Sequence, residues 1–283
     1  GGASVRSMPT PALLTDAEAT AFADALYGAR RDRTPIEPIS ATRSDLTVAD
    51  GYAIQDHLVR RLVADGEVIA GYKLGLTSSA MQTLLGVDQP DFGPVFASGI
   101  FADGVEVPVD RFIAPRIEAE IGVVLAQDLS GPHCTPADAL VATQGLVAAL
   151  EIVDSRIVDW RIRLVDTVAD LASSGAIALS SRVVPIAGFD PRLVGMVFTR
   201  NGETVATGAG AAALGDPLAA VAWLANTLAA WGVSLPAGAV IMTGALHAMV
   251  PVAPGDVFRA DFDRLGPVTV RMARVPEHDG DAA

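Results

Sequence analysis

The chain contains the stretch Arg116-Ile117-Glu118-Ala119-Glu120-Ile121-Gly122-Val123-Val124-Leu125, in which two acidic residues precede a strongly apolar run. The pattern predicts a β-strand, where residues two apart point to the same face, so Glu118 and Glu120 would lie side by side. Two such carboxylates repel each other and lose hydration, and they need a compensating positive charge. A hard divalent cation such as Mg²⁺ or Mn²⁺ would supply it. The alternative is a solvent-facing strand edge with Arg116 as ion-pair partner.

A third acidic residue interrupts a second apolar run, Leu146-Val147-Ala148-Ala149-Leu150-Glu151-Ile152-Val153-Asp154. A charge within such a run is costly unless it is paired or bound to a metal. Three carboxylates on two neighbouring strands would leave about three positions of an octahedral cation for water and a chelating substrate. For Glu151 alone, a buried salt bridge to Arg156 or Arg116 is the alternative.

Lysine occurs once in the chain, because Lys73 is the only lysine among 20 lysine and arginine residues. It lies in Gly71-Tyr72-Lys73-Leu74-Gly75-Leu76-Thr77. Lysine, unlike arginine, loses its proton readily when it is buried, and it can therefore take part in acid–base chemistry. The pattern favours a catalytic lysine. The alternative is a general bias toward arginine that left one lysine by accident.

The order of the predicted elements indicates an α+β fold. Capping patterns at Thr15 and Thr47 begin two helices, and short apolar runs separated by Gly, Pro and Asp turns follow. The predicted strands are 68–76, 116–125, 146–154, 195–199, 239–243, 256–262 and 268–272. They do not alternate with helices, so we expect a mostly antiparallel, curved sheet of roll or barrel-like form.

This order also predicts the organisation of the chain. We expect a tail and small helical part in residues 1–66, a β-rich catalytic domain in 67–275 and a tail in 276–283. Within the β-rich part, Thr135-Pro136 and Asp216-Pro217 begin two more helices, the second of which should end at Gly232. Asn201-Gly202 predicts a hairpin turn.

Composition limits the classes of partner. A formal net charge of −13 over 283 residues disfavours binding to nucleic acid or to an anionic membrane surface. No run of about 20 strongly apolar residues predicts a membrane span. The single cysteine, Cys134, excludes an internal disulfide and a multi-cysteine zinc site. These features favour a cytoplasmic protein.

An ordered series of motifs runs through the chain: Gly71-Tyr72-Lys73-Leu74-Gly75-Leu76-Thr77-Ser78, Gly86-Val87-Asp88-Gln89-Pro90-Asp91-Phe92-Gly93, Arg116-Ile117-Glu118-Ala119-Glu120, Leu150-Glu151-Ile152-Val153-Asp154-Ser155-Arg156, Ala169-Asp170 with Ala172-Ser173-Ser174, Gly208-Ala209-Gly210 with Leu214-Gly215, and Trp223-Leu224-Ala225-Asn226-Thr227. Together these motifs resemble the 2-oxopent-4-enoate (2-hydroxypenta-2,4-dienoate) hydratases and the related 4-oxalocrotonate decarboxylases of the fumarylacetoacetate hydrolase superfamily. The resemblance covers residues 45–272 and implies the fold of that superfamily.

The resemblance implies a metal-dependent lyase. It implies that Glu118, Glu120 and Glu151 hold Mg²⁺ or Mn²⁺, which a small anionic 2-oxo acid chelates. It also implies that Lys73 and Asp91 move protons while a 2-hydroxy-2,4-dienoate is hydrated to a 4-hydroxy-2-oxo acid.

Three further residues are expected to contact the substrate: Ser173, by a hydrogen bond to the substrate carboxylate, and Leu76 and Arg116, from the lysine and metal motifs. A homo-oligomer is also implied by the family. The resemblance has one departure, because Leu171 stands where the family usually has asparagine. That change bears on substrate choice more than on reaction class.

Other functions remain alternatives. A 4-oxalocrotonate-type decarboxylase would share the metal and the lysine but release CO₂. A C–C bond hydrolase would need a His/Glu pair to activate water, and a non-catalytic subunit of a complex would need neither the glutamates nor the lysine. Among the histidines, His247 follows a predicted buried strand and is the one positioned to approach a site.

Overall fold

Two capped helices begin the part of the chain that this computed structural model describes, residues 12–78, 82–83 and 86–274. Helix α1 (Asp16–Asp32) begins after Thr15, whose side chain forms a reciprocal capping box with Glu18. Helix α3 (Val48–Ala64) begins in the same way after Thr47, with Asp50 as the partner. Both predicted helix starts are confirmed, and α1 ends three residues later than the predicted end near Ala29.

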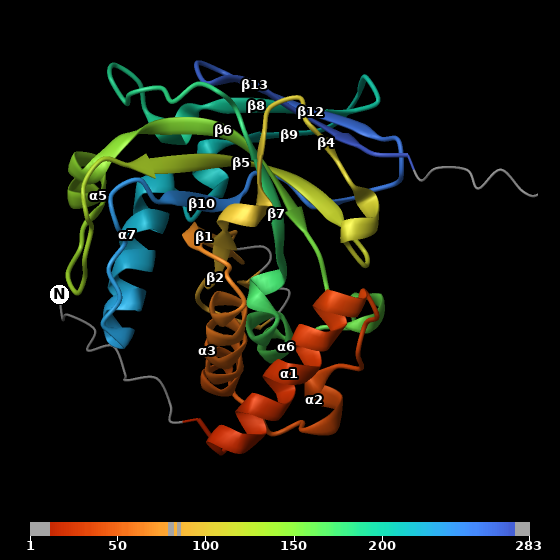
Figure 1. Cartoon of the computed structure of the whole chain (residues 1–283). Helices are drawn as coiled ribbons and strands as arrows, with labels where there is room; N and C mark the ends of the chain where they lie inside the picture. The colour runs from red at the N-terminus through yellow and green to blue at the C-terminus, as the bar shows by residue number, and fades with distance from the viewer. Residues whose placement is uncertain (1–11, 79–81, 84–85, 275–283) are drawn as a thin grey trace, which may run out of the picture.

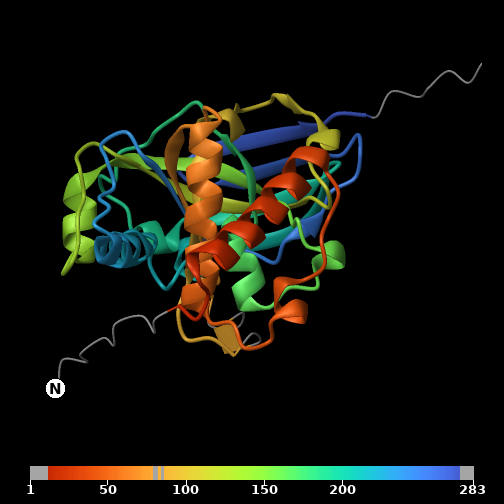
Figure 2. The ribbon, with the colours of Figure 1, turned by 60° about the horizontal axis from the view of Figure 1, so that its bottom comes forward.

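The helices cover one side of the molecule (Figures 1 and 2). Helix α3 packs on α1 and on α6 (Leu164–Ala169), and α2 (Ile39–Thr42) also packs on α6. Their shared core includes Leu26 and Ile54 from the helices but also Phe96 and Val165 from later segments. The domain boundary near residue 66 therefore stays a prediction, because the hydrophobic packing continues across it.

The larger sheet has eight strands among the described residues, in the order β2-β1-β10-β5-β6-β7-β3, with β11 paired to β5. Their bounds are β1 Ile69–Gly75, β2 Asp91–Phe96, β3 Ile100–Ala102, β5 Arg116–Leu125, β6 Thr143–Val153, β7 Ser174–Leu179, β10 Val240–Ala245 and β11 Val250–Pro251. β1 pairs with β10, and β3 with β7, in parallel, whereas the remaining pairs are antiparallel.

A second sheet lies against one face of the first (Figure 1). Its order is β4-β13-β12-β8-β9, with bounds β4 Glu106–Val107, β8 Gly195–Arg200, β9 Glu203–Ala209, β12 Val257–Phe262 and β13 Gly266–Met272. Only the β4–β13 pair in it is parallel. The expected α+β class and mostly antiparallel pairing are confirmed, and the strands form two mixed sheets that stay open.

Strand periodicity separates the two faces of the central strands. On β5 and β6, Ile117, Ile121, Leu150 and Ile152 belong to the core shared with Phe258 of the second sheet. The residues between them point to the opposite face, because successive side chains of a strand alternate. The acidic residues of β5 and β6 lie on this opposite face.

The remaining helices behave as the sequence predicts. Helix α5 (Pro136–Ala142) begins after Thr135, and α7 (Pro217–Leu228) begins after Asp216 and packs against α5. Gly232 ends the last turn with φ 68°. Single 3-10 turns are η1 Ala97–Gly99, η2 Val109–Arg111, η3 Val158–Trp160, η4 Leu171–Ser173, η5 Pro191–Leu193, η6 Gly210–Ala212 and η7 Ala229–Trp231.

Strand β2 carries no strong sequence signal. It contains Gly93-Pro94, a pair that predicts a loop, but the strand lies at one end of the larger sheet's order, where proline is tolerated.

Within the described residues, no helix is both long and apolar enough to cross a membrane.

The parallel pairing of β1 with β10 predicts a destabilised Gly71→Ala variant. A Cβ atom at Gly71 would overlap the carbonyl oxygen of Val240. We expect the free energy of unfolding to fall by about 1–3 kcal/mol or more, measured by urea denaturation. The matched control is Gly28→Ala, in helix α1, where a Cβ meets nothing within 4 Å. It should raise the free energy of unfolding by about 0.5–1 kcal/mol, and equal effects of both changes would contradict the packing described here.

Candidate active site

Three glutamates meet on the pair of strands β5 and β6. The antiparallel register places Glu118 directly opposite Glu151, and Glu120 follows two residues along β5 on the same face. Each glutamate offers one carboxylate oxygen, and these oxygens all lie within 4.8 Å of one another. Glu120 and Glu151 are fully buried. The structure therefore brings together the three residues that the sequence predicts as metal ligands.

The oxygens of this cluster have few protein partners. Glu120 Oε2 accepts a hydrogen bond of 2.9 Å from the backbone N–H of Gly244. Glu120 Oε1 and both carboxylate oxygens of Glu151 have no hydrogen-bond partner among the described residues. Buried carboxylate oxygens without donors are the ligands that a hard divalent cation prefers. The residues present thus fit Mg²⁺ or Mn²⁺.

Electrostatics also favour a cation at this position. Burial and the charge of Glu151 raise the pKa of Glu118 to about 8. The pKa values of Glu120 and Glu151 are also raised, in both cases first by burial. Without a cation the three carboxyl groups would not all be ionised at neutral pH.

Lys73 lies next to the glutamates. It is 3 % exposed, its Nζ donates a 2.8 Å hydrogen bond to the carbonyl oxygen of Ala172, and it lies 3.5 Å from Glu151 Oε1. Burial alone would lower the pKa of Lys73, but the nearby carboxylates, with Glu151 first and Asp91 next, outweigh burial and raise it. In the metal-free protein this lysine is an ammonium group.

Asp91 approaches the same point from strand β2, which pairs with β1. It is buried, its Oδ1 has no hydrogen-bond partner among the described residues, and burial raises its pKa. A Cβ atom at Gly75 would clash with Asp91 Oδ1 and lie 3.4 Å from Lys73 Nζ. The missing side chain of Gly75 therefore lets the carboxyl group and the ammonium group converge, a requirement that the sequence analysis missed.

A register shift in β10 brings hydrogen-bond partners to the strand that carries Glu118 and Glu120. The pairing of β10 with β5 shifts register between Met242 and Ala245. Beyond this shift, His247 Nε2 accepts a 2.9 Å hydrogen bond from the backbone N–H of Ala119, which lies between Glu118 and Glu120. Its Nδ1 therefore carries the proton and donates to the carbonyl oxygen of Ala248 at 2.7 Å. His247 thus approaches the site by holding the backbone of β5 between Glu118 and Glu120.

A left-handed turn supplies the acceptor for Lys73. Leu171, Ala172 and Ser173 have φ values of 58°, 51° and 59°, a region that non-glycine residues rarely adopt. The side chain of Leu171 is buried in the helical core, and its carbonyl oxygen occupies the space a Cβ would fill at Gly93. Such strain persists only where surrounding structure imposes it, and it concentrates at functional sites.

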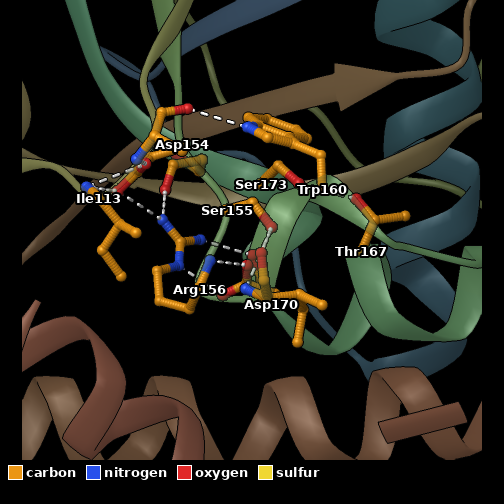
Figure 3. A network of polar contacts seen from close by, with 11 residues as sticks. Ile113, Asp154, Ser155, Arg156, Trp160, Thr167, Asp170 and Ser173 are labelled. Carbon is orange, nitrogen blue, oxygen red and sulfur yellow. Dashed lines mark hydrogen bonds and ion pairs between the residues drawn. The ribbon is translucent and has the colours of Figure 1, made fainter. Parts of the chain in front are cut away.

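A buried ion pair imposes this turn (Figure 3). Arg156 Nε donates to Asp170 Oδ1 at 2.5 Å, and its backbone N–H donates to Asp170 Oδ2 at 2.8 Å. The two other guanidinium nitrogens, Nη2 and Nη1, donate hydrogen bonds to the carbonyl oxygens of Asp170 and Ser174, respectively. Because these residues flank the turn on both sides, Arg156 fixes both of its ends. The hydroxyl of Ser173 lies 3.0 Å from that of Thr167.

The other two residues predicted to contact the substrate, Leu76 and Arg116, lie on or next to strands that carry the cluster and Lys73. Leu76 directly follows β1 with φ 55°, and its carbonyl oxygen accepts a hydrogen bond from Gln82. The guanidinium group of Arg116 lies 4.5 Å from the ring centre of Trp160, a cation–π contact that the sequence analysis did not foresee. Arg116 shares a strand face with Glu118, two residues away. The roles of these residues stay predictions.

Comparison with known proteins places the chain in a family. The family model for the fumarylacetoacetate (FAA) hydrolase C-terminal region matches residues 70–273. The chain belongs to this family. It is 48 % identical over 246 residues to a 2-keto-4-pentenoate hydratase of Paraburkholderia xenovorans, covering 87 % of this chain and 91 % of that protein.

Two further proteins are similar to the chain over most of its length. A 2-hydroxyhexa-2,4-dienoate hydratase of Comamonas testosteroni is 40 % identical over 249 residues, 87 % of this chain and 94 % of its own length. Among solved structures, the 4-oxalocrotonate decarboxylase of Pseudomonas putida G7, complexed with magnesium and adipate, is similar with a TM-score of 0.88. It is 39 % identical, and the match covers 92 % of this chain and 98 % of that one.

The buried glutamates predict how the stability of the metal-free protein depends on pH. The pKa of Glu118 is about 8 in the folded state, against an ordinary value of 4.5. The folded state therefore binds more protons between these pH values, and the free energy of unfolding should decrease as pH rises through this window. The expected loss is at most about 1.4 kcal/mol per pH unit for one proton. Urea denaturation in EDTA across the window measures it.

Two controls accompany this prediction. Glu118→Gln should flatten the pH dependence, because it removes the titrating group. Saturating Mg²⁺ should also flatten it, because the cation stabilises the ionised carboxylates. A slope that is identical with EDTA and with Mg²⁺ would show that the cluster does not bind the cation.

Proposed function

We propose that the chain is a metal-dependent hydro-lyase that adds water to a 2-hydroxy-2,4-dienoate and forms a 4-hydroxy-2-oxo acid. The observation that carries this proposal is the buried cluster of three glutamates, Lys73 and Asp91 in a chain that matches two named hydratases over 87 % of its length. A scaffold protein has no need for five ionisable groups held together, four of them buried, since each buried group is costly to remove from water.

Glu118, Glu120 and Glu151 would hold Mg²⁺ or Mn²⁺. Their oxygens fit such an ion, and similar proteins bind it: the solved decarboxylase contains magnesium. A divalent cation held there supplies positive charge that favours binding of an anionic 2-oxo acid and stabilises negative charge on its C2 oxygen. This local charge answers how a protein with net charge −13 takes an anionic substrate.

Lys73 and Asp91 would move the protons. Hydration of the dienoate requires one proton at the terminal carbon C5 and loss of the C2 hydroxyl proton, which gives the conjugated ketone, followed by addition of water at C4. Lys73 is held by Ala172 and Glu151, and Asp91 keeps an unpartnered oxygen beside it. The raised pKa of Asp91 suits a carboxyl group that alternately holds and releases a proton.

Ser173, Arg116 and Leu76 are proposed to contact the substrate. Ser173 directly follows Ala172, whose carbonyl oxygen accepts the hydrogen bond of Lys73, and the hydroxyl of Ser173 is buried beside that of Thr167. Arg116 offers a positive charge on the strand face of Glu118, and Leu76 follows the lysine strand. Replacement of Ser173 by alanine should raise KM for the substrate more than it lowers kcat if this contact is to the carboxylate.

The rival function is decarboxylation of 4-oxalocrotonate, favoured by the similarity to the solved decarboxylase. The two reactions share a cation and a lysine, and their products distinguish them. We expect the Mg²⁺-loaded protein to convert 2-hydroxypenta-2,4-dienoate to the 4-hydroxy-2-oxo acid, identified by NMR. Release of CO₂ from 4-oxalocrotonate, without hydration of the dienoate, would replace the proposal by its rival.

The same assay tests the lysine. Lys73→Met removes the ammonium group and keeps an unbranched apolar chain, and we expect kcat for hydration to fall by about 10²–10⁴-fold. Arg60→Gln on the exposed face of α3 is the control and should leave kcat unchanged. Unchanged turnover of the Lys73→Met protein would remove the lysine from the mechanism.

We also propose a homo-oligomer, because of the family resemblance. Light scattering should give a mass that is a multiple of 29.1 kDa, and a single species of 29.1 kDa would contradict the proposal. A cytoplasmic location, expected from composition, stays a prediction that cell fractionation would test.

A further inference from the structure

A cavity of about 630 Å³ lies between the C-terminal end of α1 and the segment around η2. Both views place these segments next to each other (Figures 1 and 2). None of Glu118, Glu120, Glu151 and Lys73 lines it. The cavity is therefore separate from the candidate active site.

Arginines slightly outnumber carboxylates in the charged lining of this cavity, five to four. Five arginines line it: Arg30, Arg31, Arg33, Arg111 and Arg156. Arg31 is paired with Asp32, and Arg156 with Asp170. By contrast, Arg30, Arg33 and Arg111 form no ion pair or side-chain hydrogen bond within the described ranges of the chain. The guanidinium groups of Arg30 and Arg111 instead lie 6.0 Å from the ring centre of Phe96 and 5.5 Å from that of Phe101, respectively.

The carboxylates around the cavity are mostly engaged elsewhere. Asp154 accepts hydrogen bonds from the backbone N–H groups of Ile113 and Ala114. Glu67 accepts hydrogen bonds of 2.7 and 2.9 Å from the hydroxyl of Ser98. Asp65 interacts with the hydroxyl of Tyr27. Asp110 is exposed. Glu67 attracts Arg30 through its charge, but among the described residues neither Arg30 nor Arg111 forms an ion pair with a carboxylate.

The surroundings of Arg30 disfavour its positive charge. Burial, followed by repulsion from Arg156, lowers its pKa to about 10, and the nearby negative charge of Glu67 offsets only part of this shift. Basic residues in the last turn of α1 are favoured by the helix dipole, which accounts for Arg30 and Arg31. The dipole does not account for Arg111 and Arg156, which come from other segments and face the same space. A cation removed from water needs a counter-ion.

We propose that this cavity binds a small molecule bearing an oxyanion, either a carboxylate or a phosphate group, through Arg30 and Arg111. The planar guanidinium group matches both oxyanions with paired N–H donors. Arg156 adds mainly charge, because three of its five guanidinium N–H groups donate to Asp170 and Ser174, and Asp154 lies 3.9 Å from its Nη1. The volume lies within the usual range for small-molecule sites, and Leu62 and Phe112 provide an apolar wall for an organic remainder.

The test measures binding of two probes, inorganic phosphate and succinate, to the Mg²⁺-loaded full chain by calorimetry at constant ionic strength. We expect saturable binding of at least one probe. The double variant Arg30→Gln/Arg111→Gln should bind that probe at least tenfold more weakly, and Arg60→Gln, outside the cavity, should bind it as the unchanged chain does. Preference for phosphate or for succinate identifies the oxyanion.

Activity separates this proposal from the proposed enzyme function, because neither arginine belongs to the candidate active site and the double variant should keep its turnover. Equal affinity in the double variant, or no saturable binding up to concentrations on the order of 10 mM, would overturn the proposal. If the double variant does not fold, a crystal of the unchanged chain soaked in the same probe decides: density between Arg30 and Arg111 supports the site. A carboxylate side chain of a second copy in that position would overturn it.

Discussion

Negative charge concentrated on one buried face of β5 and β6 is the constraint on which the site depends. The antiparallel register that buries Ile117 and Ile152 on one side necessarily sets Glu118 opposite Glu151 on the other. The same hydrogen-bonded pairing thus stabilises the core and creates a cluster that protein donors satisfy only in part. A cation bound there would neutralise the carboxylates that lack protein donors, so the strand pairing that forms the core also forms the cation site.

The surrounding elements are arranged around this charge. β1 carries Lys73 and β2 carries Asp91 to it, while the irregular end of β10 provides Gly244 and the segment after β10 provides His247. The helices supply no carboxylate to the cluster. Helix α6 leads instead into the turn at Leu171–Ser173, which joins the helical core to the site through the Arg156–Asp170 ion pair (Figure 3).

Sequence reasoning could predict the elements whose local signal is strong. The capping boxes at Thr15 and Thr47, the hairpin at Asn201-Gly202 and the acidic pattern of β5 each depend on neighbouring residues, and each is confirmed. β2 could not be predicted, because its pairing with β1 depends on tertiary position and overrides the Gly-Pro signal. The convergence of Arg30 and Arg111 was equally hidden, because it joins segments about 80 residues apart.

The hydrogen bond from Lys73 to Ala172 involves a main-chain oxygen, and this has a consequence for how the protein can change over time. The acceptor belongs to the backbone, so it does not depend on the chemistry of the side chain at position 172, although that position is buried and has a positive φ. The place of this oxygen depends on the path of the backbone, which Gly93 and Arg156 hold in position. A substitution at Gly93 or Arg156 would therefore move the acceptor of Lys73 without changing any residue of the cluster itself.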